Sequence, residues 1–164
     1  MGFFKKTPTS KKDREEYGPG KEDIVICPKC NASYYYKNWH HNLEDYEELD
    51  KNKNIEFKLC PADQMKSSGK FEGELTIRNV PPEVKDEIIN QLENIADRAY
   101  RKDPMDRILQ MHITDDRIEV RTSENQLALN MGRLVQRAHK NAESKVRLSE
   151  GESTARVRVW WPEK

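Results

Sequence analysis

The sequence has few cysteines and no long hydrophobic run, and each shortage excludes a class of protein. Its 164 residues contain only 3 cysteines. An odd count gives no disulfide framework of the kind that holds small secreted domains, so we expect a reducing, cytoplasmic setting. No stretch approaches the ~20 consecutive apolar residues of a membrane span, so we expect no association with a membrane.

The sequence also lacks the motifs of common catalytic sites. It has no glycine-rich loop that could hold a phosphate, and no Ser or Cys nucleophile next to a credible base. His112 with Asp115 and Asp116 is the nearest approach to an acid–base group, but polar residues at strand ends are usually solvated. We therefore do not expect an enzyme.

Charge is abundant, balanced in total and unevenly distributed. The chain carries 29 basic and 29 acidic residues, and 35% of its residues are hydrophobic. Residues 1–12 are basic, the segment from Glu44 to Asp50 is acidic, and the segment from Arg133 to Arg158 is mainly basic. A net charge of zero can therefore conceal a basic face, and only the face matters to a polyanion.

Two copies of a cysteine–proline turn stand on either side of a 29-residue spacer. The first begins at Cys27 and ends at Cys30, and the second begins at Cys60 and has Asp63 where a fourth cysteine would stand. Two such turns facing each other form the tetrahedral cage of a zinc ribbon. The pattern predicts a closed, structural Zn²⁺ site of three thiolates and one carboxylate.

The fourth ligand has two rivals. His40 and His41 lie about ten residues past Cys30, and imidazole is the commoner partner of three thiolates. A further alternative is a degraded ribbon that binds no metal and is held by Trp39 and the neighbouring tyrosines.

The chain divides into three parts by composition. Residues 1–22 have the composition of a disordered basic arm. Residues 23–68 form a zinc-ribbon-like module, with strands expected at 24–26 and 55–59 and an acidic turn or short helix between them. Residues 69–164 read as an α+β domain.

The last part alternates strand and helix signals. Strands are expected at 74–78, 107–113, 117–122, 145–149 and 155–161, a helix from Pro81–Pro82 to Asp103, and a second helix after a capping box at Ser123. This order predicts a ferredoxin-like β-α-β-β-α-β domain with one extra C-terminal strand. Both helices would cover one face of an antiparallel sheet and leave the other face open.

Strand alternation predicts that the open face is basic. The inward positions include Val146, Leu148, Val157 and Val159, which leaves charged residues facing outward. The candidate contacts to nucleic acid are Lys145, Arg147, Arg156, Arg158, Trp160 and Arg121. Like charges on neighbouring strands are costly, and phosphates would relieve them. The alternative is a solvated edge hairpin whose charges prevent aggregation.

Several of these segments together resemble a known family. The two cysteine–proline turns, Trp39-His40, Asp103-Pro104, residues 122–128 and the terminal strand 157–160 are similar to those of small bacterial proteins of the NMD type. These proteins are labelled as affecting ribosome stability and mRNA decay. The resemblance covers residues 24–161, and it implies zinc at Cys27, Cys30 and Cys60 and an association with ribosomes or RNA.

We therefore expect a non-enzymatic RNA- or ribosome-binding protein that uses a basic open sheet face. One alternative is a protein–protein adaptor that binds through the acidic segment from Glu44 to Asp50. A second is a DNA-binding regulator, although no helix-turn-helix pattern is present.

Overall fold

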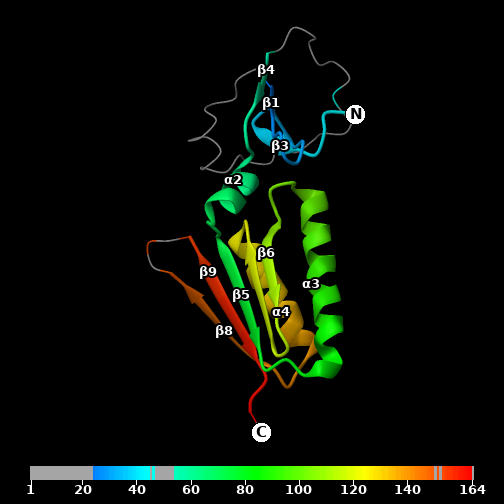
Figure 1. Ribbon diagram of the computed structural model, residues 1–164, viewed down its shortest axis with the longest axis vertical. Helices are drawn as coiled ribbons and strands as arrows, with labels where there is room; N and C mark the ends of the chain where they lie inside the picture. Colours follow the sequence, from blue (N-terminus) through cyan, green and yellow to red (C-terminus); the bar gives the residue numbers. More distant parts are fainter. Residues whose placement is uncertain (1–23, 45, 47–53, 150, 152, 164) are drawn as a thin grey trace. The chain divides into compact units, whose positions relative to one another are not determined.

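A computed structural model gives the fold, and it describes residues 24–44, 46, 54–149, 151 and 153–163 (Figure 1). The chain divides into two compact units, with the boundary between Cys60 and Pro61. We call the described residues up to Cys60 the N-terminal unit and those from Pro61 the C-terminal unit. The two units contain two mixed sheets and three described helices.

The N-terminal unit is a small four-stranded sheet in the order β3-β2-β1-β4. Its strands are β1 (Ile24–Ile26), β2 (Ser33–Tyr35), β3 (Asn38–His40) and β4 (Ile55–Phe57). The outer strand β4 runs parallel to β1, whereas β1, β2 and β3 are antiparallel neighbours. The strands predicted at 24–26 and before Cys60 are therefore confirmed.

The C-terminal unit consists of a five-stranded sheet and three helices. In chain order its elements are α2 (Pro61–Ser68), β5 (Gly73–Arg78), α3 (Pro82–Lys102), β6 (Ile108–Ile113), β7 (Arg117–Thr122), α4 (Asn125–Ala138), β8 (Glu143–Leu148) and β9 (Ala155–Trp160). The sheet order is β6-β7-β5-β9-β8. Helix α2 was not predicted from the sequence.

The sheet of the C-terminal unit differs from the predicted one in its last two strands. In a ferredoxin-like sheet, the strand that follows the second helix would lie beside β5. Here β9 takes that place and runs parallel to β5, while β8 lies at the edge. The α+β class is confirmed, but the expectation of a fully antiparallel sheet is wrong, and the ferredoxin-like detail is not confirmed.

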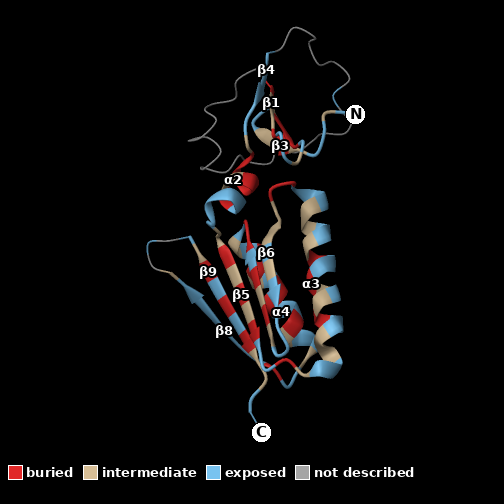
Figure 2. Ribbon diagram, in the orientation of Figure 1, coloured by how far each residue is buried: buried red, intermediate tan, exposed pale blue. Residues whose placement is uncertain are grey.

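Both long helices pack against the same face of the sheet and enclose one core. Helix α3 contributes Ile88, Leu92 and Ile95 at helical spacing, as predicted, and it ends where Asp103 precedes Pro104. Figure 2 shows buried positions alternating with intermediate ones along β5 and with mostly exposed ones along β9. The buried strand residues in this core are Leu75, Ile77, Ile118, Val120, Val157 and Val159. The opposite sheet face carries the polar side chains.

Two residues predicted to point into the core are exposed. Val146 and Leu148 of β8 are 50% and 70% exposed. All six residues of β8 are exposed, because this strand is the edge of the sheet and not its centre. Strand alternation gave the correct side of β8, but it could not show that the helices leave this edge uncovered.

Two expectations lie wholly or partly outside the described residues. The basic arm at residues 1–22 is not described, and most of the acidic segment from Glu44 to Asp50 is not described either. Within the part of the chain that is described, no helix has both the length and the hydrophobicity needed to span a membrane.

Candidate functional site

The first cysteine turn follows β1 directly. The Cys27 amide donates to the carbonyl of Ala32, and the Asn31 amide donates to the carbonyl of Cys27, both at 2.9 Å. Asn31 has a φ of 61°, a left-handed conformation that asparagine tolerates better than most residues. These bonds close a tight turn that places Cys27 and Cys30 next to each other.

The parallel pairing of β4 with β1 brings the third cysteine to the same place. Phe57 lies opposite Ile26, and the Lys58 amide donates to the Ile26 carbonyl at 3.1 Å. The two strands therefore end side by side. The chain after β4 reaches Cys60 beside the turn that follows β1.

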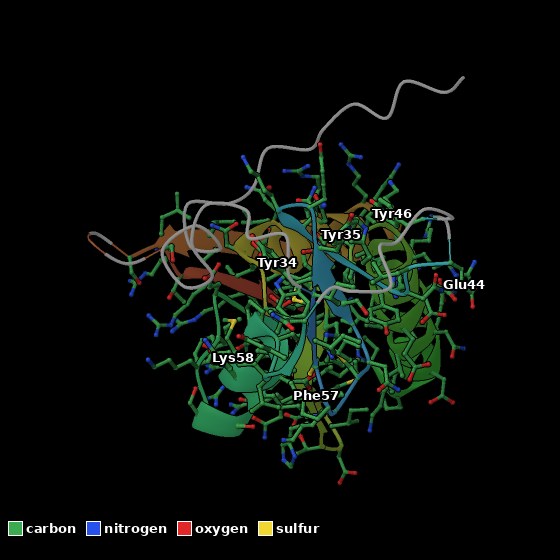
Figure 3. All side chains as sticks on the ribbon, turned by 90° about the horizontal axis from the view of Figure 1, so that it is seen from above. Tyr34, Tyr35, Glu44, Tyr46, Phe57 and Lys58 are labelled. Atoms are coloured by element: carbon green, nitrogen blue, oxygen red, sulfur yellow. The ribbon has the colours of Figure 1, made fainter. Side chains whose placement is uncertain are left out.

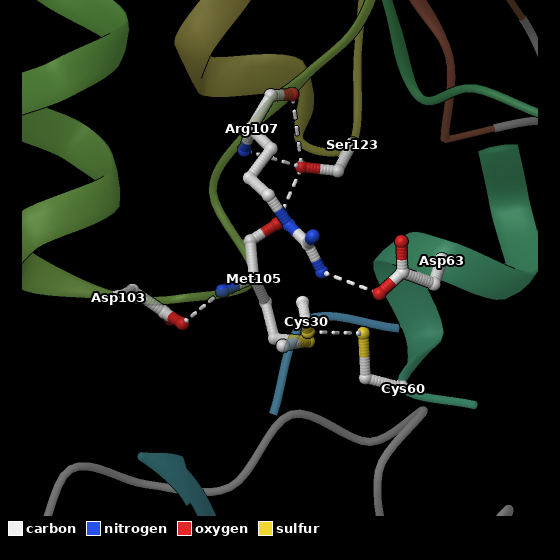
Figure 4. A network of polar contacts seen from close by, with 7 residues as sticks. All are labelled: Cys30, Cys60, Asp63, Asp103, Met105, Arg107 and Ser123. Atoms are coloured by element: carbon white, nitrogen blue, oxygen red, sulfur yellow. Dashed lines mark hydrogen bonds and ion pairs between the residues drawn. The ribbon is translucent and has the colours of Figure 1, made fainter. Parts of the chain in front are cut away.

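The ligand atoms of Cys27, Cys30, Cys60 and Asp63 all lie within 4.8 Å of one another. The Sγ atoms of Cys30 and Cys60 are 3.7 Å apart, far beyond the ~2.05 Å of a disulfide (Figure 4). With Zn–S bonds of ~2.3 Å, neighbouring sulfurs of a tetrahedral site are about 3.8 Å apart. Cys27 and Cys60 are fully buried. The residues present therefore fit a closed tetrahedral metal site.

Asp63 stands in the first turn of α2 and is buried. Its Oδ2 atom accepts from Nη2 of Arg107 at 3.5 Å, an ion pair whose side chains are only 8% and 18% exposed (Figure 4). A carboxylate has two oxygens, so this pair is compatible with metal coordination through Oδ1. A partner of this kind orients a metal ligand and offsets the negative charge of three thiolates.

The two histidines proposed as rival ligands do not join this cluster. In the N-terminal unit, His40 Nε2 lies 3.0 Å from the carbonyl oxygen of Tyr35 and 3.4 Å from the hydroxyl of Tyr46. His41 is exposed. Among the described residues, the cysteine cluster has Asp63 as its fourth member.

Arg107 lies in the loop between α3 and β6, and Ser123 holds its backbone in place. Its backbone amide donates to Ser123 Oγ at 2.8 Å, and the Ser123 hydroxyl also lies within hydrogen-bonding distance of the Met105 carbonyl (Figure 4). Ser123 was predicted to cap α4, but the residue that precedes this helix is Glu124, with no side-chain cap. The serine instead joins the start of β6 to the end of β7.

Asp106 lies in the same loop, and its environment makes the stability of the protein depend on pH. Burial, with a smaller contribution from the negative charge of Asp103, raises the pKa of Asp106 from 3.8 to about 6. The folded protein therefore binds this proton more tightly than the unfolded chain. The stabilisation is complete below about pH 4 and is lost as the pH rises through about 6.

We expect Asp106→Asn to be more stable than the wild type at pH 7.5 and to lose this advantage by about pH 4. Thermal melts of both proteins across this range measure the difference. Asp97→Asn on the exposed side of α3 is the matched control, since it removes a negative charge at an exposed position. An advantage that does not change with pH would contradict the prediction.

The second candidate site is the sheet face that the two helices leave open. The register places Lys145 opposite Arg158, and Arg147 opposite Arg156, on the hairpin of β8 and β9. All four side chains are exposed. Directly opposed residues of an antiparallel pair have Cβ atoms only ~4.5–5.5 Å apart, so like charges repel one another strongly here.

Among the described residues, acidic side chains neutralise only part of the positive charge on this face. Glu74 on β5 makes ion pairs with Arg121 at 3.5 Å and with Arg156 at 3.7 Å. The guanidinium of Arg121 also lies over the ring of Phe71, 4.5 Å from its centroid. Within the described part of the chain, Lys145, Arg147 and Arg158 have no ion pair. They are the cations of this face that no described acidic side chain neutralises.

Trp160 lies on the same face at the end of β9. It stands opposite Arg78 on β5 and opposite Glu143 on β8, and its side chain is half-buried. The ring is therefore framed by charge on both neighbouring strands. All six residues predicted to contact nucleic acid belong to β7, β8 or β9, which the sheet brings onto one surface.

Comparison with known proteins finds no matching family model, no matching curated protein and no matching solved structure. The two candidate sites are therefore argued from their geometry alone. Sequence reasoning did not identify Arg107, because its partner Asp63 is 44 residues away and no periodic pattern joins them. It did identify the four members of the cysteine cluster, and it placed the six basic-face residues on one surface.

Proposed function

We propose that this protein is a non-enzymatic, cytoplasmic RNA- or ribosome-binding protein whose open sheet face contacts the phosphate backbone. The observation that carries the proposal is the register of the β8–β9 hairpin. It sets Lys145 opposite Arg158 and Arg147 opposite Arg156, and like charges directly opposite each other destabilise an antiparallel pair. Such a hairpin is stabilised when an anion lies across it.

A nucleic-acid backbone fits the geometry of this surface. Strands are ~4.8 Å apart, so cations on two adjacent strands form a row that an extended chain of phosphates can follow. Arginine presents planar donors that match phosphate oxygens, whereas Lys145 adds a point charge. Trp160 on the same face offers a ring on which an exposed base can stack.

We also propose that Zn²⁺ occupies the cysteine cluster, held by Cys27, Cys30, Cys60 and Asp63. Soft thiolate ligands favour zinc among the common divalent ions, and a site with four protein ligands leaves no open position for substrate. The ion would therefore stabilise the N-terminal unit and take no part in a reaction. The resemblance to the NMD-type family supports the same two proposals.

The sheet face is tested by removing two of the charges that have no ion pair among the described residues. We expect Arg147→Gln/Arg158→Gln to weaken binding to ribosomes and to single-stranded RNA roughly 10-fold in 100 mM salt. The slope of log affinity against log salt should also become shallower, by roughly 0.7 for each phosphate that the protein no longer neutralises. Filter binding at several salt concentrations measures both quantities.

The matched control is Arg133→Gln/Arg137→Gln, which removes two exposed charges from α4 on the opposite side of the sheet. This control should keep the wild-type affinity and slope. Equal behaviour of the two double variants would show that net charge, and not the sheet face, governs binding. Sucrose-gradient sedimentation with and without RNase separates RNA-dependent association from a protein partner, and a preference for duplex DNA would favour a DNA-binding regulator.

A further inference from the structure

The hairpin of β2 and β3 is closed by a two-residue turn that its own residues do not favour. Tyr35 pairs with Asn38, so the turn consists of Tyr36 and Lys37 alone. Both residues have positive φ angles, 52° and 69°, as a type I′ turn requires. Asn-Gly is the usual choice at these two positions because Gly has no Cβ and Asn tolerates the left-handed region.

Tyrosine and lysine are poor choices for such a turn. A bulky residue with a positive φ is a conformational outlier, because its Cβ crowds the neighbouring carbonyl oxygen. Two such residues in succession add their costs. Strained positions of this kind concentrate at functional sites, where the side chain is needed more than the conformation is favoured.

The turn presents an aromatic ring and an ammonium group together. Tyr36 is 61% exposed, and Lys37 beside it is exposed. The ring centroid of Tyr36 lies 6.0 Å from that of Tyr35. The rings of Tyr35 and Tyr46 are in T-shaped contact, with centroids 5.1 Å apart. Figure 3 labels Tyr35 and Tyr46. The ring centroids of His40 and Tyr46 are 5.2 Å apart, so a series of ring contacts runs from Tyr36 at the turn to His40.

These contacts make the tip a rigid aromatic support. His40 also contacts the Tyr35 carbonyl, which ties β3 to β2 directly below the turn. A ring held in this way loses little conformational freedom when a flat partner stacks on it. The adjacent ammonium of Lys37 favours a flat partner that carries an anionic group.

We propose that Tyr36 and Lys37 form a contact for an unpaired nucleotide of RNA, in which the tyrosine ring stacks on the base and the lysine pairs with a neighbouring phosphate. This inference rests on the proposed function, since it takes RNA as the partner, and it adds that part of that RNA is single-stranded. A base in a duplex is already stacked on both sides, so only an unpaired base can use this ring.

The test replaces the turn with the pair that the conformation favours. In the full chain, Tyr36→Asn/Lys37→Gly removes the ring and the charge and relieves the strain at both positions. We expect its affinity for a 12-nucleotide single-stranded RNA to fall 5- to 100-fold, the range expected for the loss of one base stack. We expect the thermal midpoint of the N-terminal unit to rise by a few degrees at the same time.

Opposite signs of these two effects distinguish a ligand contact from a structural role. A purely structural pair would lose binding only by losing stability. The matched control is Phe57→Asn, which removes an exposed aromatic ring elsewhere in the same unit. It should leave the RNA affinity unchanged. A hairpin variant that binds the single-stranded RNA as tightly as the wild type overturns the proposal.

Two further probes assign the partner. A duplex RNA of the same length should bind the wild type and the hairpin variant equally, and an equal loss on both RNAs would contradict base stacking. Single-stranded DNA of the same sequence should bind no more tightly than the RNA. Tighter binding of the DNA, with the same loss in the variant, would assign the contact to DNA and overturn the proposal.

The sheet-face variant separates this inference from the function on which it rests. If Arg147→Gln/Arg158→Gln loses affinity and the hairpin variant does not, the proposed function stands and this inference fails. If the hairpin variant alone loses affinity, the RNA contact lies at the turn and the sheet face is not the binding surface. If the wild-type protein binds none of the probes, both proposals fail.

Discussion

Removal of the proposed zinc ion is expected to unfold the N-terminal unit and to leave the C-terminal unit folded. The N-terminal unit buries few large side chains, among them Ile24, Tyr34 and Trp39. Small units with a limited apolar core usually need a metal or disulfides for stability, and the three cysteines here form no disulfide. Structural zinc contributes about 10–16 kcal/mol in comparable small units, which equals or exceeds the stability of many whole domains.

Three measurements on reduced, purified protein check this expectation. Elemental analysis should find about one equivalent of zinc. After treatment with a strong chelator, hydrogen exchange should accelerate at the amides of β1 and β2 and stay slow at those of β5 and β7. Added zinc should restore the protection. The prediction fails if the reduced protein contains no metal and the chelator changes nothing.

Variants of the cluster divide its members by role. Cys27→Ser should reproduce the effect of the chelator, because it removes a buried thiolate. Asp63→Asn should weaken metal binding roughly 10- to 100-fold, since it removes a ligand charge and the partner of Arg107 together. His41→Ala is the control, and it should keep the full metal content.

Gly73→Ala is expected to destabilise the C-terminal unit by about 3 kcal/mol, near the upper end of the range for overpacked sites. A Cβ built on Gly73 would lie 2.2 Å from Thr122 Oγ1, 2.7 Å from Ala128 Cβ and 2.9 Å from the Glu124 carbonyl oxygen. None of these atoms is the end of a flexible side chain. Thr122 Oγ1 also donates to the Glu124 carbonyl at 2.7 Å, so the added methyl group would break that bond as well.

Thermal unfolding measures this loss, which should lower Tm by roughly 10–20 °C for a domain of this size. Gly69→Ala is the comparison. Gly69 has a φ of 71° and open space around it, so alanine there should cost only about 1 kcal/mol, from backbone strain. Equal losses at the two positions would show that steric crowding at Gly73 is not the cause.

Features that depend on neighbouring residues could be predicted from the sequence. The spacing of Ile88, Leu92 and Ile95 identifies the buried face of α3, and Pro82 and Asp103 mark its ends. The two cysteine turns likewise identify the metal cluster, because each turn needs only three or four residues to aim its ligands.

Features that depend on distant pairing could not be predicted. Alternation along β8 and β9 shows which side chains share a face, but it does not show which strand becomes the neighbour of β5. Because β9 and not β8 pairs with β5, Val157 is buried while Leu148 on the edge strand is exposed. The sequence around Ser123 fits a helix cap, but the serine hydroxyl instead contacts the backbone of Met105 and Arg107. Only the position of the distant loop at Met105 distinguishes the two roles.

The placement of β9 beside β5 also has a kinetic consequence. Paired residues of these two central strands lie 82 positions apart, as do Asn79 and Trp161 at their ends. The β6–β7 and β8–β9 hairpins can close within microseconds, whereas a contact at this separation must first overcome a large loss of chain entropy. Glu74 therefore meets Arg156 only at a late step of folding. Until β9 pairs with β5, the β8–β9 part of the basic face is separate from the β7–β5 part. The complete basic face therefore forms only when folding is nearly finished.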